Sequence, residues 1–198
     1  MSKADLGLIQ KLREISGLGM LDCKKALEEA GNDLDKAIDL LRKKGAAVAA
    51  KRADKGTSEG IVHAYIHPGS QIGVLVEINC ETDFVAKITE VREFANDLCL
   101  QIAALKPEFL TPEDVNPEFL AKEREILAEQ LKTSGKPANM LDKIIEGRVN
   151  KLYSEICLTK QQFLKNDKLT VEEAVKELMA KTGENIKIKR FARFEIGA

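Results

Sequence analysis

An alternating apolar run that passes almost directly into a helical pattern is the feature that most constrains the fold of this chain. Residues 72–79 are rich in β-branched side chains, which is typical of a strand. From Thr89 onward, apolar residues recur at helical spacing. The junction between the two elements reads Cys80-Glu81-Thr82-Asp83-Phe84-Val85-Ala86-Lys87. It places a polar Thr-Asp pair and a bulky Phe between two regular elements, where these side chains can be presented to a partner.

The first 45 or so residues predict a three-helix unit. Ser2 together with Asp5 indicates an N-cap for the first helix. The apolar stripe of that helix comprises Leu8, Ile9, Leu12 and Ile15. A second helix is expected over about 20–30, and a third from near Asp33 to Gly45. Residues 46–56 are small and charged, which favours an exposed helical connector.

The rest of the chain predicts a second core with both strands and helices. In chain order we expect strands at about 60–67 and 72–79, a helix that ends at Pro107, helices at about 118–133 and 138–154, a helix at 170–181 and a strand at 186–196. A hairpin turn is expected at Pro68-Gly69-Ser70-Gln71, and a helical hairpin around Ser134-Gly135-Lys136-Pro137. The predicted fold class is therefore α+β, with a three-helix domain and linker at 1–55 and, at 56–198, a core with a small antiparallel sheet and a helical hairpin.

Charge and hydropathy exclude two classes of partner. The 31 Lys and Arg residues nearly balance the 32 Asp and Glu residues, so the chain lacks the basic field that drives sequence-independent nucleic-acid binding. Residues 186–195 mix bases with aromatics, but their alternation favours a strand with solvated charges over an RNA-binding segment. No apolar run approaches the roughly 20 residues that span a bilayer, and no signal-peptide pattern follows Met1, so we expect a cytoplasmic protein.

The residues that usually carry catalysis or hold cofactors do not form a recognisable set. The four cysteines are scattered and are expected to be reduced and mostly buried. His63 and His67 lie on one expected strand, where their side chains would attach about 13 Å apart, too far to share a metal ion. Neither a phosphate-binding P-loop nor a nucleophilic Ser/His/Asp set is present. We therefore expect no cofactor, no metal and no enzymatic chemistry.

Two segments carry a resemblance to a known family. The junction at residues 80–87, together with Gly17-Leu18-Gly19-Met20-Leu21-Asp22-Cys23-Lys24-Lys25-Ala26-Leu27, closely resembles bacterial elongation factor Ts. The resemblance implies the function of that family, which is guanine-nucleotide exchange on elongation factor Tu. It also implies that the N-terminal three-helix unit is a ubiquitin-associated-like domain. The chain departs from the family pattern at Gln10, where a basic residue is expected, at Leu21 in place of Met, and at Gln162 in place of Pro.

The same resemblance implies roles for particular residues. Four of them would intrude beside the magnesium site of elongation factor Tu, namely Thr82, Asp83, Phe84 and Val85. Phe84 would act as an apolar wedge, with Asp83 in polar contacts beside it. Arg13, Met20 and Leu21 would contact the GTP-binding domain of the same partner. The alternatives are structural: Asp83 caps a turn, Phe84 packs against the following helix, and Met20 and Leu21 close the three-helix core.

The number of copies of the sheet-containing core module indicates the oligomeric state. Long members of the family have two copies, whereas this chain has one predicted hairpin, as short members do. The resemblance therefore implies a homodimer that binds two elongation factor Tu molecules, in GDP-bound and nucleotide-free states. A rival hypothesis is a scaffold that uses its ubiquitin-associated-like domain to hold some other peptide.

Overall fold

The N-terminal helices begin and end where the local sequence supplies caps. The structure is a computed structural model that describes residues 4–132 and 138–197. Helix α1 (Leu6–Ser16) begins at Asp5, whose carboxylate accepts the N–H groups of Gly7 and Leu8 at 2.8 and 3.1 Å. It ends at Gly17, which adopts a left-handed φ of +65°. Glycine adopts this conformation without steric cost, so the sequence stops the helix there.

Three helices share one apolar core in this region. Helices α2 (Met20–Glu29) and α3 (Leu34–Arg52) pack against α1 and against each other. The buried residues of this core are Ile9, Leu12, Cys23, Ala26, Leu27, Ala37 and Leu41. The three predicted helices are thus present, and the likeness to a ubiquitin-associated domain stays a prediction.

The N-terminal helices depart from the prediction at Ile15 and at the end of α3, and one predicted cap lies outside the described residues. Ile15 is 53% exposed, so its place in the buried stripe was wrong: the apolar face of α1 turns inward at Ile9 and Leu12 instead. Ser2 lies outside the described residues, and Asp5 alone supplies the cap that the structure describes. Helix α3 does not stop at Gly45, because the expected connector continues it as far as Arg52.

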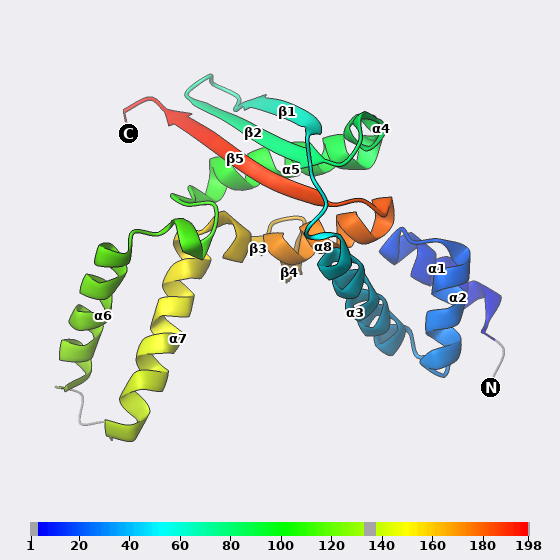
Figure 1. Cartoon of the computed structure of the whole chain (residues 1–198), viewed down its shortest axis with the longest axis horizontal. Coiled ribbons are helices and arrows are strands. Elements are labelled where there is room, and N and C mark those ends of the chain that lie inside the picture. Colours follow the sequence, from blue (N-terminus) through cyan, green and yellow to red (C-terminus); the bar gives the residue numbers. More distant parts are fainter. Residues whose placement is uncertain (1–3, 133–137, 198) are drawn as a thin grey trace. The chain divides into compact units, whose positions relative to one another are not determined.

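A three-stranded antiparallel sheet follows, in the order β1-β2-β5 (Figure 1). Its strands are β1 (Glu59–Ile66), β2 (Ile72–Cys80) and β5 (Ile186–Glu195). In the hairpin turn, the N–H of His67 donates to the carbonyl of Ile72 and the N–H of Ser70 donates to the carbonyl of His67, both at 2.9 Å. Alternate side chains of the central strand are buried, at Val74, Val76, Ile78 and Cys80. The predicted strands are confirmed to within one residue, and with them the α+β fold class.

The remaining elements are mainly helices. They are α4 (Asp83–Lys87), α5 (Thr89–Leu105), α6 (Pro117–Lys132), α7 (Ala138–Ile156) and α8 (Val171–Thr182), with short 3₁₀ turns at Pro112–Asp114 and Leu158–Lys160 and a small pair of antiparallel strands, β3 (Gln162–Phe163) and β4 (Asn166–Thr170). Helices α6 and α7 pack together as the predicted helical hairpin, side by side in Figure 1. The turn predicted at 134–137 lies outside the described residues.

The chain divides into two compact units that each collect distant segments. The first comprises Met1–Val62, Glu77–Glu93 and Glu173–Lys189; the second comprises His63–Val76, Phe94–Glu172 and Arg190–Ala198. In the first unit, α3 approaches α8 so closely at Gly45 that an added Cβ would lie 3.1 Å from the Cβ of Ala180. The Nε of Arg42 lies 3.5 Å from Oε1 of Glu177 between the same two helices. Helix α3 therefore packs on α8 within one unit.

The second unit is organised around a buried polar network that the sequence did not predict. Gln101 of α5 is fully buried, and its Nε2 donates to Oε1 of Gln161 at 3.2 Å and to the carbonyl of Gln162 at 2.9 Å. Its Oε1 accepts the N–H of Leu164 at 2.9 Å. Gln161 donates in turn to the carbonyl of Glu155 at 2.9 Å. Hydrogen bonds from buried glutamines thus hold the segment where Gln162 stands in place of the family proline.

Candidate functional site

Thr82 is the residue at which strand β2 gives way to a short helix. Its backbone is extended, with φ −128° and ψ 155°, and its Oγ1 accepts the N–H of Val85 at 3.4 Å. The helix that it caps, α4, has only five residues and ends at Lys87, so that Ile88 alone separates it from α5, which begins at Thr89. The strand-to-helix junction predicted from the sequence is therefore present, with an additional short helix inserted between the two long elements.

Phe84 is the second residue of α4 and its side chain is 79% exposed. The hypothesis that Phe84 packs against the following helix is therefore wrong. The inward-facing residue of this helix is Ala86, which is 4% exposed, and one turn of helix cannot bury both faces. An aromatic ring on a rigid turn, directed into solvent, is available to a partner molecule.

Asp83 begins α4 and forms an ion pair within it. Its carboxylate lies 2.6 Å from the Nζ of Lys87, one helical turn later. The hydrogen bond from the Lys87 side chain lowers the pKa of Asp83 below its ordinary value, so the carboxyl is ionised at neutral pH. The alternative that Asp83 is the cap was wrong, since Thr82 holds that position. Asp83 is thus a charged group placed next to the exposed ring of Phe84.

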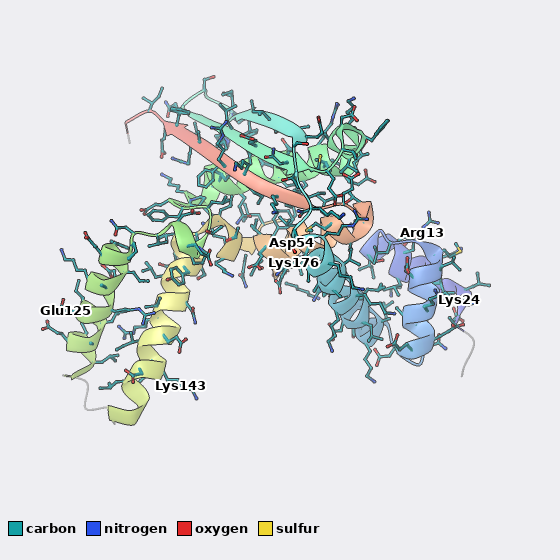
Figure 2. All side chains as sticks on the ribbon, in the orientation of Figure 1. Arg13, Lys24, Asp54, Glu125, Lys143 and Lys176 are labelled. Carbon is teal, nitrogen blue, oxygen red and sulfur yellow. The ribbon has the colours of Figure 1, made fainter. Side chains whose placement is uncertain are left out.

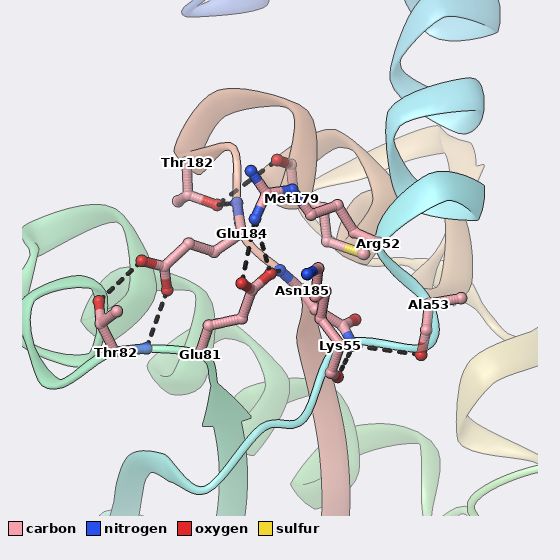
Figure 3. A network of polar contacts seen from close by, with 9 residues as sticks. All are labelled: Arg52, Ala53, Lys55, Glu81, Thr82, Met179, Thr182, Glu184 and Asn185. Carbon is pink, nitrogen blue, oxygen red and sulfur yellow. Dashed lines mark hydrogen bonds and ion pairs between the residues drawn. The ribbon is translucent and has the colours of Figure 1, made fainter.

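Two carboxylates hold the base of this helix, as Figure 3 shows. Glu184 accepts two hydrogen bonds from Thr82, from the hydroxyl at 2.7 Å and from the backbone N–H at 3.1 Å. Glu81 accepts the N–H of Asn185 at 2.6 Å and two contacts from Nη1 of Arg52, at 3.1 and 3.0 Å. These donors, Asn185 first and Arg52 after it, lower the pKa of Glu81 below its ordinary value. All five residues belong to the first compact unit.

The N-terminal candidates lie on the surface of the same unit. Arg13, labelled in Figure 2, is exposed in the last turn of α1. Met20 and Leu21 begin α2 and are 47% and 72% exposed. Neither belongs to the buried core of the three helices, so the alternative that they close this core was wrong. Gln10, the departure from the family pattern, is also exposed.

Potential metal ligands are dispersed over the residues that the structure describes. In the residues that the structure describes, no three His, Cys, Asp or Glu side chains are arranged to hold a metal ion. The four cysteines are buried and unpaired, as expected. His67 is hydrogen bonded through Nδ1 to the hydroxyl of Tyr65 at 3.0 Å. None of the helices within 4–132 and 138–197 combines the length and apolar character that crossing a bilayer needs.

Comparison with known proteins agrees with the resemblance carried by residues 17–27 and 80–87. The sequence model of the family described as elongation factor TS matches residues 14–198. The chain belongs to the elongation factor Ts family. Elongation factor Ts of Carboxydothermus hydrogenoformans is 56% identical over 190 residues, covering 96% of this chain and 88% of the relative. That of Desulfosudis oleivorans is 49% identical over 197 residues, covering the whole of both chains. Membership places the chain among the translation elongation factors.

Neither the sequence pattern nor the resemblance to the elongation factor Ts family indicates the residues that support the Phe84 helix. These residues are Arg52, Glu184 and Asn185, which contact the two residues that precede α4. The local signal is weak: Glu184 and Asn185 simply follow Gly183, whose left-handed φ of +72° ends α8. Thr82 and Glu184 lie 102 positions apart in the chain, and a local pattern carries no information over such a distance.

Proposed function

We propose that this protein binds elongation factor Tu, releases its GDP and so permits exchange for GTP. The observation that carries the proposal is the exposed ring of Phe84, held on a capped turn of helix within a Thr-Asp-Phe-Val segment. A ring in this position can enter a neighbouring protein without disturbing the fold that presents it.

The proposed mechanism displaces the magnesium ion of the partner. A GTPase holds GDP partly through a magnesium ion that bridges to phosphate oxygens, so moving the elements that position the ion weakens nucleotide binding. Phe84 enters between partner side chains as an apolar wedge, and Thr82, Asp83 and Val85 contact the adjoining backbone. The ionised carboxylate of Asp83 supplies polar contacts beside the wedge.

Exchange follows from a difference in binding free energy between two states of the partner. The protein binds nucleotide-free elongation factor Tu more tightly than the GDP complex, and by reciprocity the same coupling free energy weakens GDP. No covalent bond is made or broken, so the protein is an exchange factor rather than an enzyme. It needs no cofactor, and its role in translation places it in the cytoplasm without contact with nucleic acid or membrane.

The N-terminal helices supply a second contact with the partner. Arg13, Met20 and Leu21 are exposed on one unit together with Phe84 and would bind the GTP-binding domain. We propose that residues 1–55 act as a ubiquitin-associated-like domain that adds affinity, whereas the wedge in 56–198 carries exchange.

We also propose a homodimer that binds two partner molecules. The second unit exposes large apolar side chains on the sheet and just beyond its last strand, at Ile66, Leu75, Phe194 and Ile196, which are 43–75% exposed. The N–H of Ile196 donates to the carbonyl of Gln71 at 3.0 Å, which brings Ile196 next to the start of β2. A second copy would cover the patch by a two-fold contact. Light scattering at micromolar concentration tests this: a mass near that of one 21.9 kDa chain, with full exchange activity, would exclude it.

A fluorescent GDP experiment tests the proposed function directly. Elongation factor Tu is loaded with fluorescent GDP, mixed with excess unlabelled GDP and this protein, and the fall in fluorescence is followed by stopped flow. We expect the release rate to rise with the concentration of this protein and to approach a limiting value. Release at the spontaneous rate, at every concentration, would refute the proposal.

A further inference from the structure

The two residues that precede the Phe84 helix and the two that follow Gly183 hold each other reciprocally (Figure 3). The carboxylate of Glu184 accepts the backbone N–H of Thr82, and the carboxylate of Glu81 accepts the backbone N–H of Asn185. Each segment thus supplies an anion to the backbone of the other. Hydrogen bonds to ionised acceptors are the stronger kind, and here they fix both backbones at once.

Glu184 also orients the hydroxyl group that caps α4. The Thr82 hydroxyl carries one proton, which it donates to Oε1 of Glu184 at 2.7 Å. With the proton directed there, the lone pairs of Oγ1 are left to accept the N–H of Val85, at 3.4 Å. That cap contact is long, and without Glu184 the hydroxyl is free to rotate away from it. The carboxylate therefore sets the rotamer on which the cap depends.

Phe84 depends on this support because little else fixes the helix that carries it. A five-residue helix is far shorter than the roughly 12 residues at which isolated helices become marginally stable. The ring of Phe84 is 79% exposed and gains no fixed position from packing. Of the α4 side chains, Ala86 is buried, and Asp83 pairs with Lys87 within the helix. Thr82 adds a restraint from outside the helix, through its contacts with Glu184.

The opposite side of the contact is itself immobilised. The N–H of Glu184 donates to Oγ1 of Thr182 at 3.3 Å, next to the left-handed Gly183. Asn185 is 1% exposed, and its Nδ2 donates to the carbonyls of Lys55 at 2.8 Å and Ala53 at 3.3 Å. Glu184 is therefore a fixed anchor rather than a surface side chain that adapts to Thr82.

We infer that Glu184 is a positioning residue for nucleotide exchange: through Thr82 it holds the Phe84 helix in the orientation in which the ring enters the partner. The inference rests on the proposed exchange function. It assigns Glu184 to the rate of GDP release rather than to affinity, because Glu184 acts on the orientation of the wedge, whereas Arg13, Met20 and Leu21 would supply binding.

Release of fluorescent GDP from elongation factor Tu, measured over a range of concentrations of the full chain, separates the two quantities. For Glu184→Ala we expect the limiting release rate to fall by about 10- to 100-fold, with the half-saturating concentration changed less than threefold. Glu184→Gln keeps one acceptor oxygen, so its limiting release rate should lie between those of wild type and Glu184→Ala. Glu146→Gln, an exposed change on α7, is the control and should match wild type.

A double-mutant cycle asks whether Glu184 acts through Thr82. Thr82→Val keeps the shape of the side chain and loses the hydroxyl. If Glu184 works through that hydroxyl, the double variant should lose little more than either single variant. Full additivity would show that Glu184 does not act through the hydroxyl and would overturn its role in orienting the cap. A limiting rate in Glu184→Ala equal to that of wild type would overturn the whole inference.

Amide hydrogen exchange on the protein alone gives a readout that does not involve the partner. In Glu184→Ala, the N–H groups of Thr82 and Val85 should lose protection, while those of β2 keep it. Unchanged protection at Thr82 and Val85 would overturn the inference even if release slowed. If wild type itself fails to accelerate release, the proposed function fails; this amide test still decides whether Glu184 holds the helix. If Glu184→Ala does not fold, the same comparison is made with Glu184→Gln.

Discussion

The guanidinium group of Arg52 meets the carboxylate of Glu81 beside the Phe84 helix, with Nη1 3.1 Å from Oε1 and 3.0 Å from Oε2. Together with the N–H of Asn185 it lowers the pKa of Glu81 below the ordinary value of 4.5. Because the pKa is lower in the folded than in the unfolded chain, this carboxylate stabilises the fold above about pH 4.5. The stabilisation is lost as the pH falls through the lowered value.

Glu81→Gln should therefore be less stable than wild type at pH 7, and the difference should shrink as the pH falls below about 4.5. Urea unfolding from pH 3 to pH 7, followed by circular dichroism, measures both curves. As the control, Glu146→Gln should show the same pH dependence of the free energy of unfolding as wild type. A difference between Glu81→Gln and wild type that is the same at every pH would contradict the assignment.

Phe84→Ala should keep the fold and lose exchange. The ring is 79% exposed, so the free energy of unfolding should change by less than about 0.5 kcal/mol. Loss of a central aromatic contact should weaken the interaction that drives GDP release by about 2–4 kcal/mol. Phe119→Ala, which removes a 42% exposed ring on α6, is the matched control. If the two variants released GDP equally fast, Phe84 would not be the wedge.

Met20→Ala combined with Leu21→Ala should weaken binding without slowing the limiting rate. Both side chains lie outside the three-helix core, so stability should be retained. We expect the half-saturating concentration in the GDP release assay to rise about tenfold, which is about 1.4 kcal/mol. Leu6→Ala removes another leucine of this region that is 71% exposed, and it should behave as wild type. A fall in the limiting rate instead would show that these residues act in the release step.

Gly60→Ala should destabilise the protein, whereas Gly56→Ala should not. A Cβ at Gly60 would clash with the carbonyl oxygen of Ile78 and would lie 2.9 Å from Cα of Asn79, so strand β2 would have to move. A Cβ at Gly56 would meet nothing within 4 Å. Chemical unfolding should give a loss of about 2 kcal/mol or more at Gly60 and a change within about 0.5 kcal/mol at Gly56. Equal stabilities would mean that β1 and β2 separate readily at this point.

The cysteines should resist thiol reagents until the chain unfolds. Burial raises the pKa of Cys99 and of Cys157 to about 11, and it also raises the pKa of Cys80. At pH 8 about one thiol in a thousand is then ionised at the first two positions, and the thiolate is the reactive form. Labelling followed by mass spectrometry should modify native protein slowly and denatured protein at four sites. Rapid modification of native Cys99 would reveal local opening of α5.

Helix and strand positions could be predicted because their signals are local. Gly17 and Gly183 end helices through left-handed backbone, and alternation marks β2 within one residue of its bounds. Ile15 was misplaced because a stripe drawn at helical spacing is wider than the face that α2 and α3 cover. The candidate site residues came from family resemblance, since pattern alone favoured a packed Phe84.

The supporting contacts could not be predicted because each joins residues far apart in the sequence. Gln101 and Gln161 read as ordinary polar positions, yet both are buried and hydrogen bonded to each other. The same holds for Glu184 at the site. Its carboxylate reaches Thr82 only because the fold brings these two distant residues together. Burial of a polar side chain is decided by its distant partner, which neither composition nor periodicity reveals.

The pairing of Thr82 with Glu184 also orders events on the ribosome. At about 5–20 residues per second, the 102 positions between them take roughly 5–20 s to synthesise. Until Glu184 emerges, the helix that carries Phe84 lacks the carboxylate that holds Thr82. If the proposed function holds, a nascent chain without Glu184 therefore presents its N-terminal helices well before it presents a fixed Phe84 ring.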